Sequence, residues 1–366
     1  MLSCLFHSGP ATPGSDHPAA SCRVDDLRLD HLNRETPLAA AAAALTPLDQ
    51  FFVRSHFSVP ELSESGYVLR VDGRVRDRLA LTFEEIRERP QAHAIVTLEC
   101  AGNGRALLDP RPHGTPWRLG AFGTARFGGT ALGPLLLRAG PLPEARFVRF
   151  AGADQGEVAP GRTEPFARSV PIADALADGP LLAWEMDDLP LTAEHGFPLR
   201  SVLPGRYGVD SVKWLVRIEV GSEPFGGFFQ DERYRYVGQD GLADGTPVAR
   251  VRPRSLIARP AAGASVRAGR ETPIAGSAWS GEGEIALVEV SVDGGRTWAQ
   301  AQLTSASARH GPTLWRLPWT PTRAGRHRLV SRARDEAGNI QPPTAVWNEL
   351  GYGNNAAHSI DVEVVE

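Results

Sequence analysis

The stretch Leu98–Arg105, LECAGNGR, places Cys100 where an apolar run gives way to small and glycine residues. The preceding run, Ala94–Leu98, is short and typical of a buried strand, so we expect Cys100 to leave that strand in a turn. Three roles are open for such a cysteine: a buried structural thiol, a nucleophile, or a ligand to a soft metal. No CxxC pair or HExxH motif stands nearby, which disfavours a zinc cage. The residues alone do not decide among the three roles.

Around this stretch, residues 41–250 alternate short apolar runs with Gly/Pro turns and a few helical segments. Thr82–Glu88 (TFEEIRE) begins with a threonine followed by acidic residues, which predicts a helix start. A second short helix is expected at Ile172–Ala177. Further strands are predicted at Tyr67–Asp72, Phe147–Phe150 and Lys213–Val220. This mixture predicts an irregular α+β domain.

Residues 251–366 have a different pattern, with short strands at regular spacing and turn residues between them. Ile285–Val292 alternates, Asp293–Gly295 predicts a turn, and Thr297–Trp298 resumes the strand, which together indicate a hairpin. Further strands are predicted at Leu314–Trp319, Arg326–Arg334 and Ile360–Val365. We expect an all-β immunoglobulin-like sandwich that binds a partner or dimerises, with the chemistry upstream of it.

Residues 1–40 read as a flexible N-terminal tail that contains Cys4 and Cys22. This segment has no basic and apolar signal sequence and no twin-arginine signal, so a cytoplasmic protein is expected. No apolar run is long enough to span a membrane. A net charge of −4 gives no reason to expect a nucleic-acid partner. Lys213 is the single lysine among many arginines, a mild hint that its ammonium group is needed.

Five segments in order resemble the conserved motifs of the sulfite oxidase family of molybdopterin oxidoreductases. They are FFVRSH (Phe51–His56), LECAGNGR (Leu98–Arg105), GAFGTARFGG (Gly120–Gly129), HGFPLR (His195–Arg200) and PGRYGVDSVKW (Pro204–Trp214). Near the C-terminus, AWSGEGEI, VDGGRTW and VWNELG resemble that family's dimerisation domain. The resemblance covers roughly residues 45–366.

The resemblance implies that Cys100 is the protein's own ligand to molybdenum, beside the two sulfurs of one pterin dithiolate. A soft thiolate suits such a sulfur-rich coordination sphere. Arg200 and Lys213 are expected at the pterin phosphate, because a dianion needs cationic donors. His56 and His195 are expected at the pterin heteroatoms. The whole set of expected cofactor residues is Phe52, Val53, Arg54, Ser55, His56, Asp154, His195, Arg200, Ser211, Val212 and Lys213. For Asp154, a plain Asx-turn role remains open.

The substrate pocket is where the sequence departs from the family. By resemblance, Arg54, Arg105 and Trp117 match pocket residues that attract an oxyanion. The family's tyrosine at the metal falls on Phe166, and a lysine before Trp117 falls on His113. An arginine after the Trp-Asn pair falls on Leu350. Because each change removes a positive charge or a hydrogen-bond donor, weaker or slower handling of sulfite is expected, with loss of one charged hydrogen bond worth roughly ten- to a hundredfold.

The resemblance thus implies two-electron oxygen-atom transfer, with oxidation of sulfite to sulfate as the first hypothesis. Nitrate or sulfoxide reduction on the same scaffold, and a non-catalytic cofactor-binding relic, remain open. No haem-binding segment is seen, so electrons are expected to pass to a separate carrier such as a c-type cytochrome. A homodimer formed through the C-terminal domain is also expected.

Overall fold

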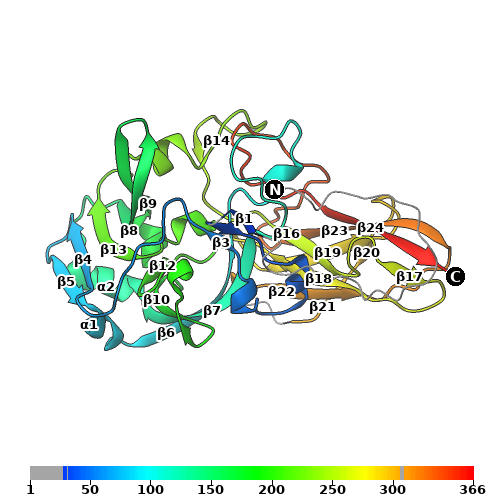
Figure 1. Cartoon of the computed structure of the whole chain (residues 1–366), viewed down its shortest axis with the longest axis horizontal. Coiled ribbons are helices and arrows are strands. Elements are labelled where there is room, and N and C mark those ends of the chain that lie inside the picture. Colours follow the sequence, from blue (N-terminus) through cyan, green and yellow to red (C-terminus); the bar gives the residue numbers. More distant parts are fainter. Residues whose placement is uncertain (1–27, 31, 306–308) are drawn as a thin grey trace.

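The computed structural model describes residues 28–30, 32–305 and 309–366, and the predictions for Cys4 and Cys22 lie outside these residues. Figure 1 shows two units placed end to end along the long axis of the molecule. Strands β4 (Val68–Gly73) and β5 (Leu79–Thr82) lie at one end, and β17 (Ser265–Arg267) lies at the other. Among the described residues, no helix is long and apolar enough to cross a membrane.

The first unit is built on two mainly antiparallel sheets. One has the order β5-β4-β13-β8-β9, in which only the β13–β4 pair is parallel. The other has the order β11-β10-β7-β6, with β12 also paired to β10. Their bounds are β6 Gln91–Glu99, β7 Phe122–Ala131, β8 Phe147–Ala159, β9 Arg162–Pro171, β10 Leu181–Met186, β11 Leu189–Pro190, β12 Arg200–Val202 and β13 Leu215–Gly221. The unit is α+β, with strands dominating.

The α-helices within the described residues are short, and their ends follow the sequence signals. Helix α1 (Phe83–Arg87) starts at Thr82, whose hydroxyl accepts a hydrogen bond from the Glu85 amide while the Glu85 side chain reaches back to the Thr82 amide. This reciprocal capping satisfies two amides that a helix start would leave unpaired. The others are α2 (Leu132–Ala139) and α3 (Ile172–Leu176). The predicted helices at 82–88 and 172–177 are therefore confirmed, each a residue or two shorter.

The remaining short elements are single turns and bridges between the sheets. They are η2 Leu38–Ala42, η3 Leu48–Gln50, η4 Arg105–Leu107, η5 Ala193–His195, η6 Gly208–Asp210, η7 Phe228–Glu232, β14 Arg235–Tyr236 and β15 Thr246–Pro247. Several of these elements carry residues that line the cavities around Cys100. A turn can point a side chain in directions that the regular alternation of a strand does not allow.

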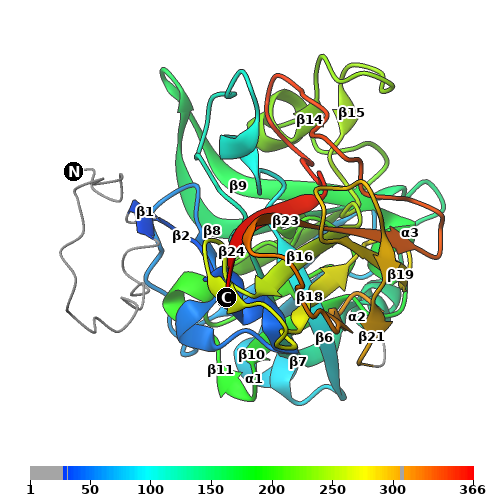
Figure 2. The ribbon, with the colours of Figure 1, turned by 90° about the vertical axis from the view of Figure 1, so that its right-hand side faces the viewer.

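The second unit consists of two sheets that face each other across an apolar core. Their orders are β16-β18-β22-β21 and β17-β24-β23-β19-β20. The bounds are β16 Arg254–Arg259, β18 Ile274–Trp279, β19 Ile285–Ser291, β20 Ala299–Gln300, β21 Gln302–Leu303, β22 Thr313–Leu317, β23 Gly325–Asp335 and β24 His358–Val365. The predicted hairpin is present, since Val290 pairs with Ala299. Figure 2 looks at this unit from the C-terminal end, with β23 and β24 in front of the first unit.

The expected flexible tail over residues 1–40 needs a correction for its last part. Strand β1 (Arg28–Asp30) pairs with β2 (Asn33–Arg34), which in turn pairs with β3 (Val53–Arg54). The Thr36 hydroxyl donates to the Phe122 carbonyl at 2.6 Å, and the Glu35 carboxylate accepts from the Gly120 amide. Element η2 packs against β16 of the second unit. Composition could not reveal this packing, because polar and small residues are typical of tails as well as of tightly bonded edges.

Candidate active site

Cys100 follows directly on β6 and begins a tight turn. Its amide donates to the Ala121 carbonyl at 2.9 Å, and its carbonyl accepts from the Asn103 amide at 2.9 Å. The turn needs Gly104, whose φ of +84° is a backbone conformation that side chains disfavour. The thiol is buried, and burial raises its pKa, an effect that the nearby Arg54 guanidinium opposes. Without an added positive group, this thiol is a poor nucleophile at neutral pH.

Two cavities meet at the Cys100 side chain. The first cavity has a volume of about 660 Å³ and the second about 1010 Å³. Arg54, His56, Cys100 and Tyr234 line both of them. A group bound to the sulfur would therefore face both cavities at once.

The first cavity gathers most of the expected cofactor residues from five separate parts of the chain. Its polar lining includes Arg54, Ser55, His56, Asp154, His195, Arg200, Ser211 and Lys213. Two buried polar atoms of this wall, Asp154 Oδ1 and Arg200 Nε, have no hydrogen-bond partner among the described residues. Buried polar atoms are nearly always paired, so an unpaired donor and acceptor in one cavity indicate a missing polar ligand.

Arg200 is held so that its position does not depend on that ligand. Its Nη1 donates to the His195 carbonyl at 2.9 Å and its Nη2 to the Ser211 carbonyl at 3.2 Å. Burial lowers the pKa of Arg200 to about 10, which still leaves the guanidinium charged at neutral pH. The side chain is thus a fixed cation whose Nε donor has no partner among the described residues.

Lys213 also lies in the first cavity and faces other cations. Its Nζ donates to the Ser55 hydroxyl at 2.8 Å and to the Glu194 carbonyl at 2.7 Å. Burial, and then Arg200, lower its pKa well below the usual value. Burial raises the pKa of Asp154 to about 7, although Lys213 opposes the shift. An anion bound here would relieve the mutual repulsion of Lys213 and Arg200.

The two expected histidines are neutral for the same reason. Burial lowers the pKa of His195 to about 3, with help from Lys213, and lowers that of His56 well below its usual range. The His56 ring stacks on Phe166 at 4.7 Å, and its Nε2 lies 2.7 Å from the Tyr234 hydroxyl. A neutral imidazole can donate at one nitrogen and accept at the other, which suits the mixed heteroatoms of a pterin.

These features fit a molybdenum–pterin group. One thiol is available as a ligand, the Arg200 guanidinium and the Lys213 amine suit a phosphate, and the unpaired Asp154 and Arg200 atoms suit polar edges of a pterin. Among the described residues there is no group of three or more His, Cys, Asp or Glu side chains that could hold a metal ion. Cys100 and the first cavity supply what such a group needs from the protein.

The second cavity carries the expected substrate residues Arg54, Arg105, His113 and Trp117. Arg105 Nε donates to the Leu350 carbonyl at 3.1 Å and its Nη1 to the Thr115 carbonyl at 3.0 Å. Gly102 makes this possible, because a Cβ at that position would lie 2.7 Å from Arg105 Nη1. Arg54 Nη1 is similarly fixed by Asn33 Oδ1 at 3.0 Å. Both guanidinium groups are therefore held in place beside Cys100.

The structure places the remaining expected residues as follows. Phe52 and Phe166 line the first cavity, and Leu350 lines the second. Val53 and Val212 are buried next to the site and line neither cavity.

Sequence reasoning missed several residues of the second cavity. Tyr234 lines both cavities, so replacement of a tyrosine by Phe166 does not leave the site without a phenol hydroxyl. Arg233 adds a further cation, and Phe229 and Tyr352 add aromatic walls. The aromatic and charged run at 228–236, FFQDERYRY, was the available signal, but it contains no spacing that points to chemistry.

Comparisons with known proteins agree with this site. Residues 56–229 match the family described as "Oxidoreductase molybdopterin binding domain", and residues 247–365 match "Mo-co oxidoreductase dimerisation domain". The chain is 38% identical to a sulfite oxidase of Gallus gallus, over 95% of this chain and 81% of that protein. It is 36% identical to the mitochondrial sulfite oxidase of Homo sapiens, over 87% of this chain but 62% of that protein. The chain therefore belongs to the sulfite oxidase family of molybdenum-cofactor oxidoreductases.

More distant relatives share the scaffold. The sulfane dehydrogenase SoxCD from Paracoccus pantotrophus superposes with a TM-score of 0.80 at 26% identity, over 96% of this chain and 92% of that one. A nitrate reductase of Emericella nidulans is 28% identical over 94% of this chain, but this covers 44% of the reductase. The chain spans about two thirds of the length of the mitochondrial relatives it matches.

Proposed function

We propose that this protein binds molybdenum with one pterin dithiolate and oxidises sulfite to sulfate. The observation that carries the proposal is the position of the Cys100 thiol, at the junction between a cavity with unpaired polar atoms and a cavity with fixed cations. A metal on this sulfur would contact cofactor on one side and substrate on the other. The domain division is part of the proposal, with residues 41–250 catalytic and residues 251–366 an immunoglobulin-like dimerisation domain.

In the first cavity the chain's residues hold the cofactor. Arg200 and Lys213 bind the phosphate, His56 and His195 contact pterin heteroatoms, and Asp154 accepts a hydrogen bond from a ring N–H. When bound, the cofactor supplies two-electron oxygen-atom transfer. Ser55 keeps the Lys213 ammonium in place through its hydroxyl at 2.8 Å. Cys100 supplies the thiolate.

In the second cavity, Arg54 and Arg105 attract and orient the oxyanion through charge-assisted hydrogen bonds. Their own contacts to Asn33 and to the Leu350 and Thr115 carbonyls keep them in place before the substrate arrives. Trp117, fully buried, closes one wall. Tyr234 holds its hydroxyl against His56 and can donate to an oxygen at the junction. His113 is exposed at the cavity and adds a hydrogen-bonding group there.

Reduction of nitrate or a sulfoxide is the second candidate. Leu350, Phe228 and Phe229 make part of the second cavity apolar, which favours a substrate with less charge than sulfite. The similarity to a nitrate reductase supports the same alternative. Sulfite oxidation remains the first candidate, because the sulfite oxidases have a higher sequence identity to this chain than the nitrate reductase has.

The partners form the rest of the proposal. A c-type cytochrome or similar carrier accepts the electrons, and two copies of the chain associate through the second unit, as the name of its matching family suggests. Two further points stay predictions: the redox group is the molybdenum–pterin without haem, and the protein is cytoplasmic. Haem absorption of the purified protein and cell fractionation test them.

The experiment combines metal analysis with steady-state assays on the full chain from a host that makes the pterin. We expect about one molybdenum per chain and reduction of cytochrome c or ferricyanide by sulfite, exceeding turnover with nitrate or a sulfoxide as acceptor. Cys100→Ala should abolish both metal and turnover, and Cys22→Ser is the matched thiol control. A Cys100→Ala protein that keeps molybdenum and oxidises sulfite would refute the assignment.

A further inference from the structure

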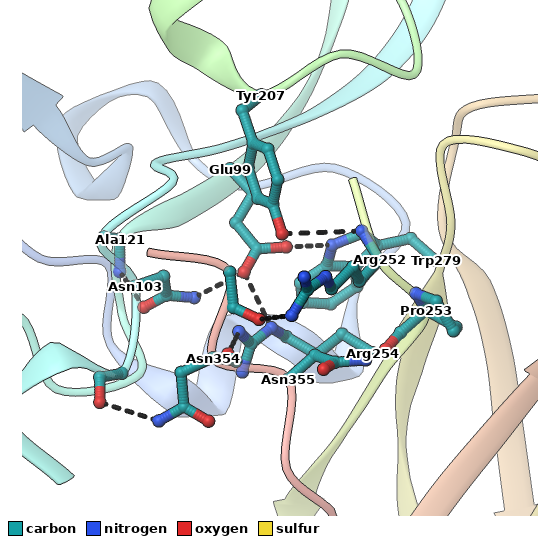
Figure 3. Close-up of polar contacts among 12 residues, drawn as sticks. Glu99, Asn103, Ala121, Tyr207, Arg252, Pro253, Arg254, Trp279, Asn354 and Asn355 are labelled. Carbon is teal, nitrogen blue, oxygen red and sulfur yellow. Dashed lines mark hydrogen bonds and ion pairs between the residues drawn. The ribbon is translucent and has the colours of Figure 1, made fainter. Parts of the chain in front are cut away.

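Glu99, the residue before the Cys100 thiol, has its carboxylate in the interface between the two units. Its side chain is buried, with 1% exposed. Oε1 accepts from Asn103 Nδ2 at 3.1 Å, and Oε2 accepts from Trp279 Nε1 at 2.8 Å. Arg254 Nε lies 2.7 Å from Oε1. Figure 3 shows these groups converging from the two units, with Trp279 and Arg254 on strands of the second.

The Glu99–Arg254 contact is an ion pair in which both side chains are almost fully buried. Arg254 Nε has no well-directed hydrogen-bond partner among the described residues, so the contact is mainly Coulombic. Arg254 also donates through Nη2 to the Asn354 carbonyl. The directed hydrogen bonds to the Glu99 carboxylate therefore come from Trp279 and Asn103. A buried carboxylate that loses such a partner is strongly disfavoured.

The far side of the Cys100 turn is also held by the second unit. The Gly353 amide donates to the Ala101 carbonyl at 2.8 Å, and Asn354 Nδ2 donates to the Gly104 carbonyl at 2.9 Å. A Cβ on Gly104 would lie 3.0 Å from Asn354 Nδ2, so the approach is close. The second unit thus contacts residues on both sides of Cys100 in the sequence, Glu99 before it and Ala101 and Gly104 after it.

The Trp279 ring has a second anchor that does not depend on its N–H group. It stacks on Phe122 with centroids 4.9 Å apart and an interplanar angle of 23°. The neighbouring Ala121 carbonyl accepts the Cys100 amide, and the Ala121 amide donates to Asn103 Oδ1 at 3.1 Å. A phenylalanine at position 279 would keep an aromatic ring against Phe122 and lose the hydrogen bond to Glu99, together with some buried volume that a Trp→Phe change at any buried position also loses.

We propose that Glu99 is a positioning residue for the Cys100 thiol, fixed by Trp279 and Arg254, so that the second unit holds the cofactor-binding turn in shape. This rests on the proposed role of Cys100 as the metal ligand. It assigns the second unit a task in the active site in addition to association between chains.

The test uses the full chain with Cys4→Ser and Cys22→Ser, which leaves Cys100 as the only thiol. Trp279→Phe is compared with Trp315→Phe, a matched control in β22. Trp315 is equally buried in the second unit, but its Nε1 has no hydrogen-bond partner among the described residues. Two quantities are measured: the rate of Cys100 alkylation by a maleimide in cofactor-free protein, and the sulfur-to-metal absorption band of the holoprotein. Melting temperatures are recorded for all variants.

Trp279→Phe should raise the alkylation rate about tenfold, because an unpaired Glu99 favours local opening of the turn, and should shift the absorption band. Trp315→Phe should leave both unchanged at a comparable loss of melting temperature. Glu99→Gln, with the same shape and no charge, should act in the same direction as Trp279→Phe.

The proposal would be overturned if the alkylation rates of Trp279→Phe and Glu99→Gln stayed within about twofold of the parent rate. It would also be overturned if Trp315→Phe raised the rate as much as Trp279→Phe, because the rate would then report stability alone. Failure of the proposed function looks different. In that case the parent holoprotein lacks molybdenum or sulfite turnover, whereas the alkylation rates of cofactor-free protein still respond to Trp279→Phe.

Discussion

The first and second cavities share the Cys100 thiol but differ in how their walls are assembled. The first takes its polar wall from segments that read as motifs in the sequence, among them Phe51–His56 and Pro204–Trp214. The second takes much of its wall from irregular segments, including η7 and the loop around Leu350. Under the proposed function, the cofactor is recognised by residues in contiguous motifs, whereas the substrate is recognised by side chains from loops that lie far apart in the sequence.

The largest expected effect concerns the first cavity. Arg200→Met removes a fixed cation, so the molybdenum and pterin content should fall by about ten- to a hundredfold. Metal analysis and pterin fluorescence measure the content. Arg206→Met is the control, because Arg206 is also a buried arginine but lines neither cavity and is ion-paired with Asp210. Full cofactor content in folded Arg200→Met protein would contradict the assignment of the phosphate site.

A pH experiment tests the charge balance of the same cavity. His195 has its pKa lowered to about 3, so the unfolded chain binds this proton at a higher pH than the folded chain does. As the pH is lowered from about 7 to about 5, the free energy of unfolding of the cofactor-free protein should therefore decrease. His195 should account for about 2 kcal/mol of this decrease. His195→Gln should flatten this dependence, as measured by urea unfolding. Bound anionic cofactor should also flatten it, and equal slopes with and without cofactor would contradict an anion site here.

The second cavity is tested by adding a charge. Leu350→Arg should lower KM for sulfite by about tenfold, since a new cation beside Arg105 strengthens anion binding, with kcat changed little. The Leu350 carbonyl that holds Arg105 is retained in any substitution. Leu350→Met is the control for size. Equal KM values for the two variants would show that charge at this position does not govern binding.

The smallest effect is expected at Tyr234, where the cavities meet. Tyr234→Phe removes a hydroxyl that lies 2.7 Å from His56 Nε2, and kcat should fall by about fivefold, which corresponds to one hydrogen bond of about 1 kcal/mol. Tyr67→Phe is the control, because its buried hydroxyl bonds the Leu215 carbonyl, away from both cavities. The control should lose stability and keep kcat. Identical kcat values in the two variants would show that the Tyr234 hydroxyl does not take part in the reaction.

Sequence by itself determined the features that depend on neighbours along the chain. The Thr82 cap, the hairpin at 285–300 and the strand before Cys100 follow from local propensity and alternation. The motifs around Cys100, Arg200 and Lys213 also identified the family, because each contains its functional residues within a few positions. Sequence did not reveal the packed segment at Asn33–Ala42, whose partners Gly120, Phe122 and β16 lie far along the chain.

Only the tertiary structure decided which distant groups share the site. Tyr234 reaches His56 across 178 positions, and Trp279 reaches Glu99 across 180. No local pattern encodes such pairs, since each depends on where the sheets and loops of the whole fold bring two side chains together. The family of the chain could thus be predicted from the motif that contains Cys100, whereas the groups that hold and surround its sulfur depend on packing between remote segments.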